Sequence, residues 1–268
     1  MNRLDMLAVK TDRAKKHIQD LDATIYTFLN SHPYEVSIHH NCYTDRVEWT
    51  LDRATDIPLP ISALAGDAIQ NLRSALDHLV GQLVLANGRT PIDGVTGFPI
   101  CDSPKKYASA KRRGVIKGVH ARAEAIIDGF KPYDTGDVDL WRLHHLNNID
   151  KHRLLLSAAS AVSHHDMLPS QREEVARIFL ASHPDALAAP DLTGVVVKPA
   201  HPRHASFPLE VGKVFFSIPY SDMEHNFKFT LGVAFNEPGV VQRELIIDTL
   251  KRFADRVGRV ISDLAPLL

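Results

Sequence analysis

The sequence has little of several features that mark particular classes of protein. It contains 2 cysteines in 268 residues, too few for the disulfide framework of a small secreted protein. No apolar run approaches the roughly 18 residues that a membrane-spanning helix needs. The first residues carry charges throughout and have no apolar stretch of signal-peptide length. We therefore expect a cytoplasmic protein with no membrane partner.

The sequence also lacks a large net charge and the common nucleotide-binding motifs. The chain has 31 Lys and Arg against 32 Asp and Glu, a formal net charge of −1, so any attraction to nucleic acid must be local. No GxGxxG, P-loop or GxSxG pattern occurs, which leaves nucleotide-dependent and covalent-hydrolase activities unsupported. The apolar fraction of 44% is that of an ordinary globular protein with ample material for a core.

Apolar residues recur at helical spacing over four long stretches. The clearest predicted helix covers residues 62–86, where leucines, alanines and one isoleucine form a continuous apolar stripe. Between the central helices, residues 89–118 are rich in Pro and Gly, so we expect an irregular segment with one helical turn near Tyr107. The predicted helices are 3–30, 62–86, 137–162 and 240–266, with shorter ones around 120–129 and 169–182.

An alternation of apolar and polar residues predicts strands near both ends of the chain. Residues 36–51 form a β-hairpin with its turn at 41–45. Residues 227–235 form a half-buried antiparallel strand whose Phe227-to-Phe235 face should meet the final helix, with 214–218 as its neighbour and 195–197 as a third strand.

These elements favour the α+β class, because the strands are too few and too scattered for a βαβ series. We predict a single α+β domain over residues 1–268, a helical bundle with an N-terminal β-hairpin and a small C-terminal antiparallel sheet. The helical core covers about 1–165, and the C-terminal sheet plus helix covers about 190–268.

Each central helix carries a line of polar and aromatic residues. At about 100° per residue, positions separated by four, three and four residues fall on one line. Two such lines would form a shared polar cleft that binds a substrate. They would equally serve as solvent-facing sides or as a buried, satisfied hydrogen-bond network. The first line is Asp67, Asn71, Ser74 and His78, and the second is Trp141, His145, Asn148 and His152.

A basic segment lies between the central helices. Residues 103–123 contain seven Lys and Arg and no acid, and Lys111, Arg112 and Arg113 are the candidates for binding RNA phosphates. Such a run is commonly a solvated loop. Its position would let it close over the cleft between the two helices.

One short motif points to a known family. Arg73-Ser-Ala-Leu-Asp-His78 is an Arg-x4-His pattern on a predicted helix, and it resembles the signature of HEPN domains, helical bundles many of which are metal-independent ribonucleases. The resemblance implies that Arg73 binds phosphate, that His78 is the general acid or base, and that the protein is a homodimer acting on RNA without a cofactor. This chain has Ser74 where the family commonly has Asn, Asp or His. The segments GDAIQNLRSALDHLV, FPI and LNNIDKHRLLL also resemble uncharacterised bacterial proteins.

A non-catalytic interpretation accounts for the same residues. Arg73 and Asp77 stand at i and i+4, the spacing of a common helical ion pair. A binding or structural protein would have the polar lines buried and paired, with Arg73 bound to Asp77. A ribonuclease would have Arg73 and His78 exposed together with residues 105–113 nearby.

Fifteen histidines also raise the possibility of a metal site. His145 and His152 are two helical turns apart, roughly 10 Å, too far to bind one ion directly. The sequence contains no HExxH and no pair of CxxC motifs. A metal site would require folding to bring in His78 or Asp150, and we predict none.

Overall fold

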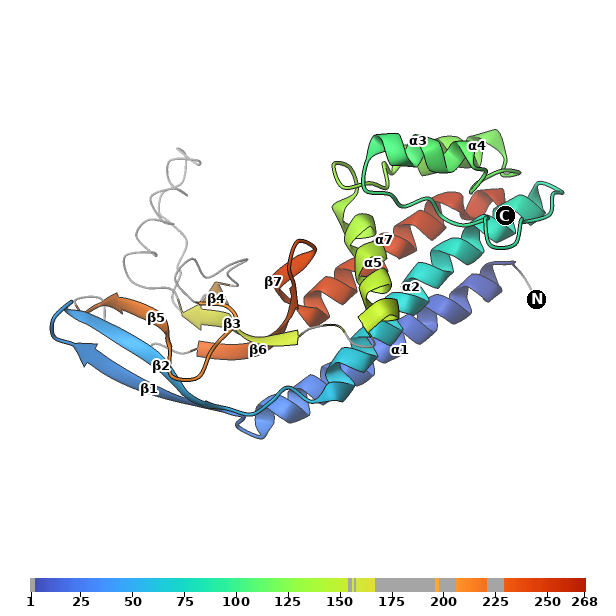
Figure 1. Cartoon of the computed structure of the whole chain (residues 1–268). Helices are drawn as coiled ribbons and strands as arrows, with labels where there is room; N and C mark the ends of the chain where they lie inside the picture. The colour runs from blue at the N-terminus through green and yellow to red at the C-terminus, as the bar shows by residue number, and fades with distance from the viewer. Residues whose placement is uncertain (1–2, 154–155, 157, 167–195, 198–205, 221–228) are drawn as a thin grey trace, which may run out of the picture.

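The computed structural model describes residues 3–153, 156, 158–166, 196–197, 206–220 and 229–268. Within these residues it contains six α-helices and seven strands, which confirms the α+β class. Three long helices run side by side, and a fourth crosses them (Figure 1). The long helices are α1 (Arg3–Asn30), α2 (Leu59–Ala86) and α7 (Ile246–Leu264), crossed by α5 (Val138–Arg153), while α3 (Pro104–Arg112) and α4 (Ala121–Gly129) lie over one end of the bundle.

The strands form two antiparallel sheets. The first sheet projects from the bundle as an arm built on the predicted hairpin (Figure 1). Its order is β1-β2-β5, with β1 at Tyr34–Asn41, β2 at Arg46–Ala54 and β5 at Val214–Pro219. The second sheet has the order β4-β3-β6-β7, with β4 at Val196–Val197, β3 at Ala158–Asp166, β6 at Phe229–Glu237 and β7 at Val241–Leu245.

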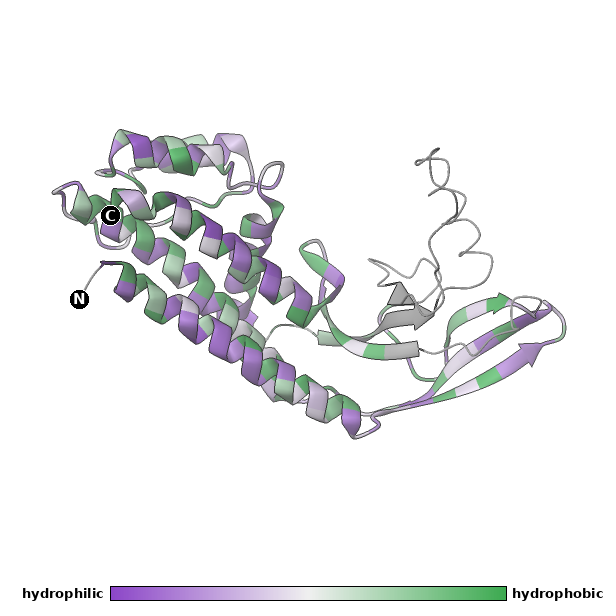
Figure 2. Cartoon of the chain, turned by 180° about the vertical axis from the view of Figure 1, so that it is seen from behind, coloured by the Kyte–Doolittle hydropathy of each residue, from purple (hydrophilic) through white to green (hydrophobic). Residues whose placement is uncertain are grey.

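One hydrophobic cluster joins the helical bundle to the second sheet. The stripe of α2 is buried as predicted, and Phe235 of β6 packs with the apolar side of α7. Figure 2 shows the complementary pattern, with hydrophilic residues on the outward sides of the long helices. A second cluster around Trp49 lies in the arm, and Tyr34 packs against both clusters. The Tyr34 hydroxyl is 2.7 Å from Ser160 Oγ, which links the arm to β3.

The structure corrects the predicted end of the second central helix. We predicted helix to residue 162, but α5 ends at Arg153 and Ala158–Asp166 is strand β3. This strand pairs with β6, so its backbone groups are satisfied across the sheet instead of within a helix. Lys151, His152 and Arg153 in the last turn of α5 are the local stop signal, because cations are favoured at a helix C-terminus. Helix α5 therefore ends nine residues before its predicted end.

Three other predictions differ from the structure. The final helix was predicted from residue 240, but Val241–Leu245 is strand β7, which pairs with β6, and α7 begins at Ile246. Residues 214–218 form a strand, but it pairs with β2 in the arm and not with β6. The segment 89–118 contains two and a half turns of helix, α3, in place of one turn, because Ser103 caps the helix and Pro104 begins it. The helix predicted at 169–182 and the contacts of Phe227 lie outside the described residues. No helix in the described part of the chain has the length and apolar character needed to cross a membrane.

The two tryptophans test the single-domain prediction, since Trp49 lies in the arm and Trp141 in α5. We expect Trp49→Phe and Trp141→Phe variants to unfold in urea at the same midpoint when each is followed by the fluorescence of its remaining tryptophan and by far-ultraviolet circular dichroism. The reason is that the clusters meet at Tyr34, and coincident transitions indicate one cooperative unit. An arm midpoint clearly below that of the bundle would mean two independent units.

Candidate functional site

Arg73 is the centre of a polar cluster between α2, α5 and the segment before α3. Its Nη1 donates to Asp77 Oδ1 at 2.6 Å, and its Nη2 donates to the carbonyl oxygen of Phe98 at 2.9 Å. The backbone N–H of Phe98 donates to the same Asp77 oxygen at 2.9 Å. Arg73 and Asp77 therefore hold both backbone polar groups of Phe98, and we call these three residues with His144 the Arg73 clamp.

His144 completes the clamp from α5. Its Nδ1 accepts from Arg73 Nε at 3.3 Å, and its Nε2 lies 3.1 Å from the side-chain amide of Asn148. Burial, and then the positive charge of Arg73, lower the pKa of His144 to about 4. The imidazole is thus neutral at physiological pH, with Nδ1 as the acceptor for Arg73.

His145, the next residue, points to a different partner. Its Nε2 is 2.7 Å from Asp102 Oδ1, and its ring contacts the Trp141 ring at a centroid distance of 4.3 Å. The indole N–H of Trp141 is buried without a hydrogen-bond partner among the described residues. With 29% of its side chain exposed, His145 is accessible from solvent while its orientation is set by a carboxylate.

Asp102 connects this cluster to the basic helix α3. It also binds Lys106, and that hydrogen bond, with a further one from His145, lowers the pKa of the Asp102 carboxyl against the effect of partial burial. Burial and the neighbouring Asp102 charge raise the pKa of Cys101, so this residue is a thiol and not an activated nucleophile. The Phe98-to-Asp102 segment is thereby fixed at both ends just before α3 begins.

The predicted line on α2 does not act as one unit. Asp67 and His78 are exposed, while Asn71 and Ser74 are half-buried. Asn71 donates to the backbone oxygen of Asp67 on its own helix. The exposure expected for a ribonuclease holds for His78 but not for Arg73, whose side chain is 11% exposed. The Arg73–Asp77 pair expected for the non-catalytic alternative is present.

The predicted line on α5 is only partly gathered. His145 and Asn148 belong to the cluster described above, whereas His152 is exposed at the end of the helix. Near that end, Asp150 lies against Gly66 of α2, and burial, with the Asp67 charge, raises the pKa of Asp150. No group of three or more His, Cys, Asp or Glu suited to a metal ion occurs among the residues that the structure describes.

The basic segment divides into paired and unpaired cations. Lys111 binds both Asp128 and Glu124 of α4 at 2.7 Å, and Lys106 binds Asp102. The remaining five cations are exposed and have no carboxylate partner within the described residues. We call them the basic surface, and they are Lys105, Arg112, Arg113, Lys117 and Arg122.

Sequence reasoning missed three members of the cluster: His144, Phe98 and Asp102. His144 stands beside the predicted line and not on it, and Phe98 contributes only backbone groups, which no side-chain pattern reveals. The nearest sequence signal was the Arg73–Asp77 spacing, which correctly indicated an ion pair. It did not indicate that the pair would also hold a segment 21 residues away.

We expect Arg73→Lys to destabilise the protein by about 1–3 kcal/mol. A lysine amine lacks the planar fork that reaches Asp77 and Phe98 together, so a partly buried carbonyl loses its donor. Urea denaturation would measure the change, with Arg112→Lys on the exposed side of α3 as the matched control. Equal stability of both variants and the wild type would show that the clamp does not stabilise the fold.

The low pKa of His144 predicts acid sensitivity. The unfolded chain binds a proton at this residue near pH 6.5, and the folded chain only near pH 4. Neutral His144 therefore makes its full contribution to the free energy of unfolding above pH 6.5. This contribution, up to about 3 kcal/mol, is lost as the pH falls from 6.5 to about 4. Denaturation at pH 7 and pH 4.5 should show a smaller loss in His144→Gln than in the wild type. An identical loss in both proteins would exclude His144 as the cause.

Comparison with protein-family models, curated proteins and solved structures found no match to this chain.

Proposed function

We propose that this chain binds RNA through the basic surface, and that the Arg73 clamp holds that surface in place. The observation that carries the proposal is the division of cations in residues 103–123. Lys106 and Lys111 form ion pairs with carboxylates, while five cations remain exposed without a carboxylate partner in the described residues. Exposed cations gathered on one segment supply the local positive field that a chain of net charge −1 otherwise lacks.

The geometry of α3 supports contact with an extended polyanion. Lys105 and Arg112 are seven residues apart, so they lie on the same side of the helix about 10 Å apart along its axis. Arg113 follows at the C-cap, with its Nη1 near Ser109 Oγ of the same helix. These positions would contact successive phosphates along one strand. RNA is the polyanion that the HEPN resemblance implies.

The polar contacts that hold α3 support this role, because α3 has no long hydrophobic face of its own. Its buried residues are Tyr107 and Ala110. The Tyr107 hydroxyl donates to Asp128 at 2.6 Å, which ties α3 to α4. The start of α3 is positioned by Asp102, which is bound to His145 and Lys106. A surface fixed in this way presents its cations without the entropy cost of ordering a loop.

Charge removal from the basic surface tests the proposal. We expect Lys105→Ala/Arg112→Ala/Arg113→Ala to weaken binding of a labelled mixed-sequence single-stranded RNA by roughly tenfold and to lower the slope of log affinity against log salt by about 2. The matched control is Arg13→Ala/Lys16→Ala/Lys251→Ala, which removes the same charge from exposed positions of α1 and α7. Equal effects of the two triple variants, or no binding by the wild type, would contradict the proposal.

Metal-independent cleavage of the bound RNA is the second candidate function. It is favoured by the His145–Asp102 pair, because Asp102 orients the imidazole while Nδ1 of His145 has no hydrogen-bond partner among the described residues. In such a step Nδ1 accepts the proton of a 2′-hydroxyl, the 2′-oxygen attacks phosphorus, and the 5′-oxygen leaves with a proton from water. The cations would stabilise the charge that develops on phosphate.

The two candidate bases are distinguished by cleavage assays in EDTA. Loss of cleavage in His145→Ala with retention in His78→Ala would assign the chemistry to the His145–Asp102 pair. The reverse result would support the Arg73–His78 site that the family resemblance implies. Binding without cleavage by any of the proteins would leave RNA binding alone as the function.

A further inference from the structure

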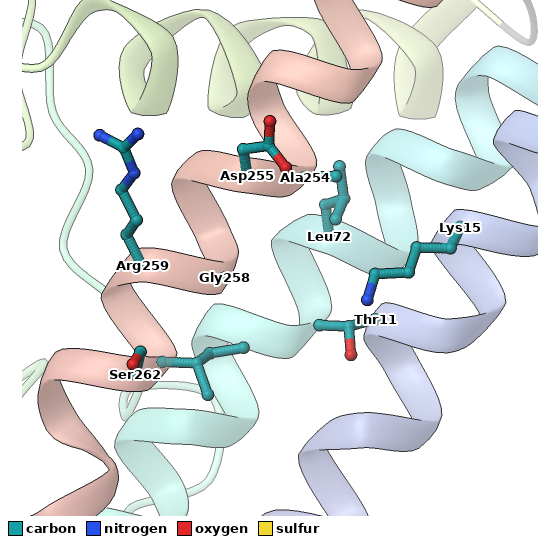
Figure 3. Close-up of a pocket in the computed structure, with 9 residues that line it drawn as sticks. Thr11, Lys15, Leu72, Ala254, Asp255, Gly258, Arg259 and Ser262 are labelled. Carbon is teal, nitrogen blue, oxygen red and sulfur yellow. The ribbon is translucent and has the colours of Figure 1, made fainter.

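A groove of about 500 Å³ opens between α1 and α7. Leu72 of α2, itself only 1% exposed, forms the floor where the outer helices separate. Figure 3 shows α7 on one side of this groove and α1 on the other, with α2 between and behind them. The volume is within the range of small-molecule sites, roughly 300–1,000 Å³. None of its lining residues belongs to α3 or to the clamp.

Gly258 keeps the wall of this groove open. It stands in the interior of α7, where glycine costs about 1 kcal/mol relative to alanine. A Cβ atom at this position would meet nothing within 4 Å, and the residue is exposed. The packing of the fold therefore does not require a glycine here. A molecule lying against the α7 backbone would require it.

The lining combines charge, hydroxyl groups and an apolar floor. Lys15 and Arg259 are exposed, and neither has an ion-pair partner in the described part of the chain. Lys15 extends from α1 toward α7, whereas Arg259 stands at the opposite margin with its guanidinium directed away from α1 (Figure 3). With Asp255 as the single carboxylate, the lining has a charge of +1. Ser262 and Asp255 provide acceptors, and Leu72 and Ile261 provide apolar surface.

We propose that this groove binds a small phosphorylated molecule with hydroxyl groups and a flat apolar body, the chemistry of a nucleoside monophosphate. The phosphate lies beside Lys15, a charge-assisted contact. The hydroxyl groups donate to the Asp255 carboxylate, and the flat body covers Leu72 and Ile261. The proposal does not depend on RNA binding, because the basic surface lies on other elements.

Calorimetric titration of the full chain with adenosine monophosphate tests the site. We expect saturable one-to-one binding, with adenosine and ribose 5-phosphate binding at least tenfold more weakly because each lacks one half of the recognised chemistry. Lys15→Ala should weaken binding about tenfold, the effect of one lost hydrogen bond to a charged group. Lys16→Ala, the neighbouring exposed lysine on α1, should leave it unchanged. Absence of saturable binding to the wild type would overturn the proposal.

Gly258→Leu separates occupancy of the groove from stability. Leucine has a higher helix propensity than glycine and meets no neighbour at its Cβ, so the variant should fold at least as stably as the wild type. We expect it to lose binding of adenosine monophosphate and to retain RNA binding. The triple variant of the basic surface should show the opposite pattern. Undiminished binding of adenosine monophosphate by a folded Gly258→Leu protein would place the nucleotide elsewhere and reject this site.

Discussion

The guanidinium of Arg73 must satisfy groups from three separate parts of the chain at once. Asp77 is one turn away on α2, Phe98 lies beyond the end of that helix, and His144 comes from α5. A charged group with 11% exposure needs such partners, because burial without them would cost several kcal/mol. The relative positions of α2, α5 and the segment leading to α3 are thereby coupled through one side chain. Burial in this cluster, and then the positive charge of Arg73, lower the pKa of His144 and keep it neutral.

The other side of α5 is fixed by ion pairs to the C-terminal part of the chain. Arg142 binds Glu244 at 2.8 Å, and Arg252 binds Asp139 at 2.9 Å and Glu244 at 2.6 Å. With Glu244 of β7 and Arg252 of α7 holding one face and Arg73 the other, α5 has little freedom to rotate. His145 is consequently presented toward Asp102, and the basic surface that follows Asp102 inherits this fixed position. The position of the exposed cations thus depends on the polar cluster, and the position of the polar cluster depends on how the helices pack.

Neutralisation inside the fold decides which charges remain for a partner. The basic segment contains seven cations, yet α4 brings Asp128 and Glu124 to Lys111, and Asp102 takes Lys106. Composition alone therefore overstates the positive charge available on this surface. The groove between α1 and α7 shows the converse case. No sequence pattern marks its lysine and arginine as binding residues. They line a groove because the helices separate here and Gly258 has no side chain to fill the space.

The sequence by itself determined the α+β class, the long helices, the hairpin and the Arg73–Asp77 pair, because these depend on periodicity and spacing within one segment. Only the tertiary structure decided that residues 158–166 are a strand. Their extended conformation is favoured over a helix because β6 supplies partners for their backbone hydrogen bonds. It alone joined His144 and Phe98 to Arg73 and placed Asp102 beside His145. Such contacts bridge as many as 71 residues of chain, and no local pattern records the three-dimensional path that closes them.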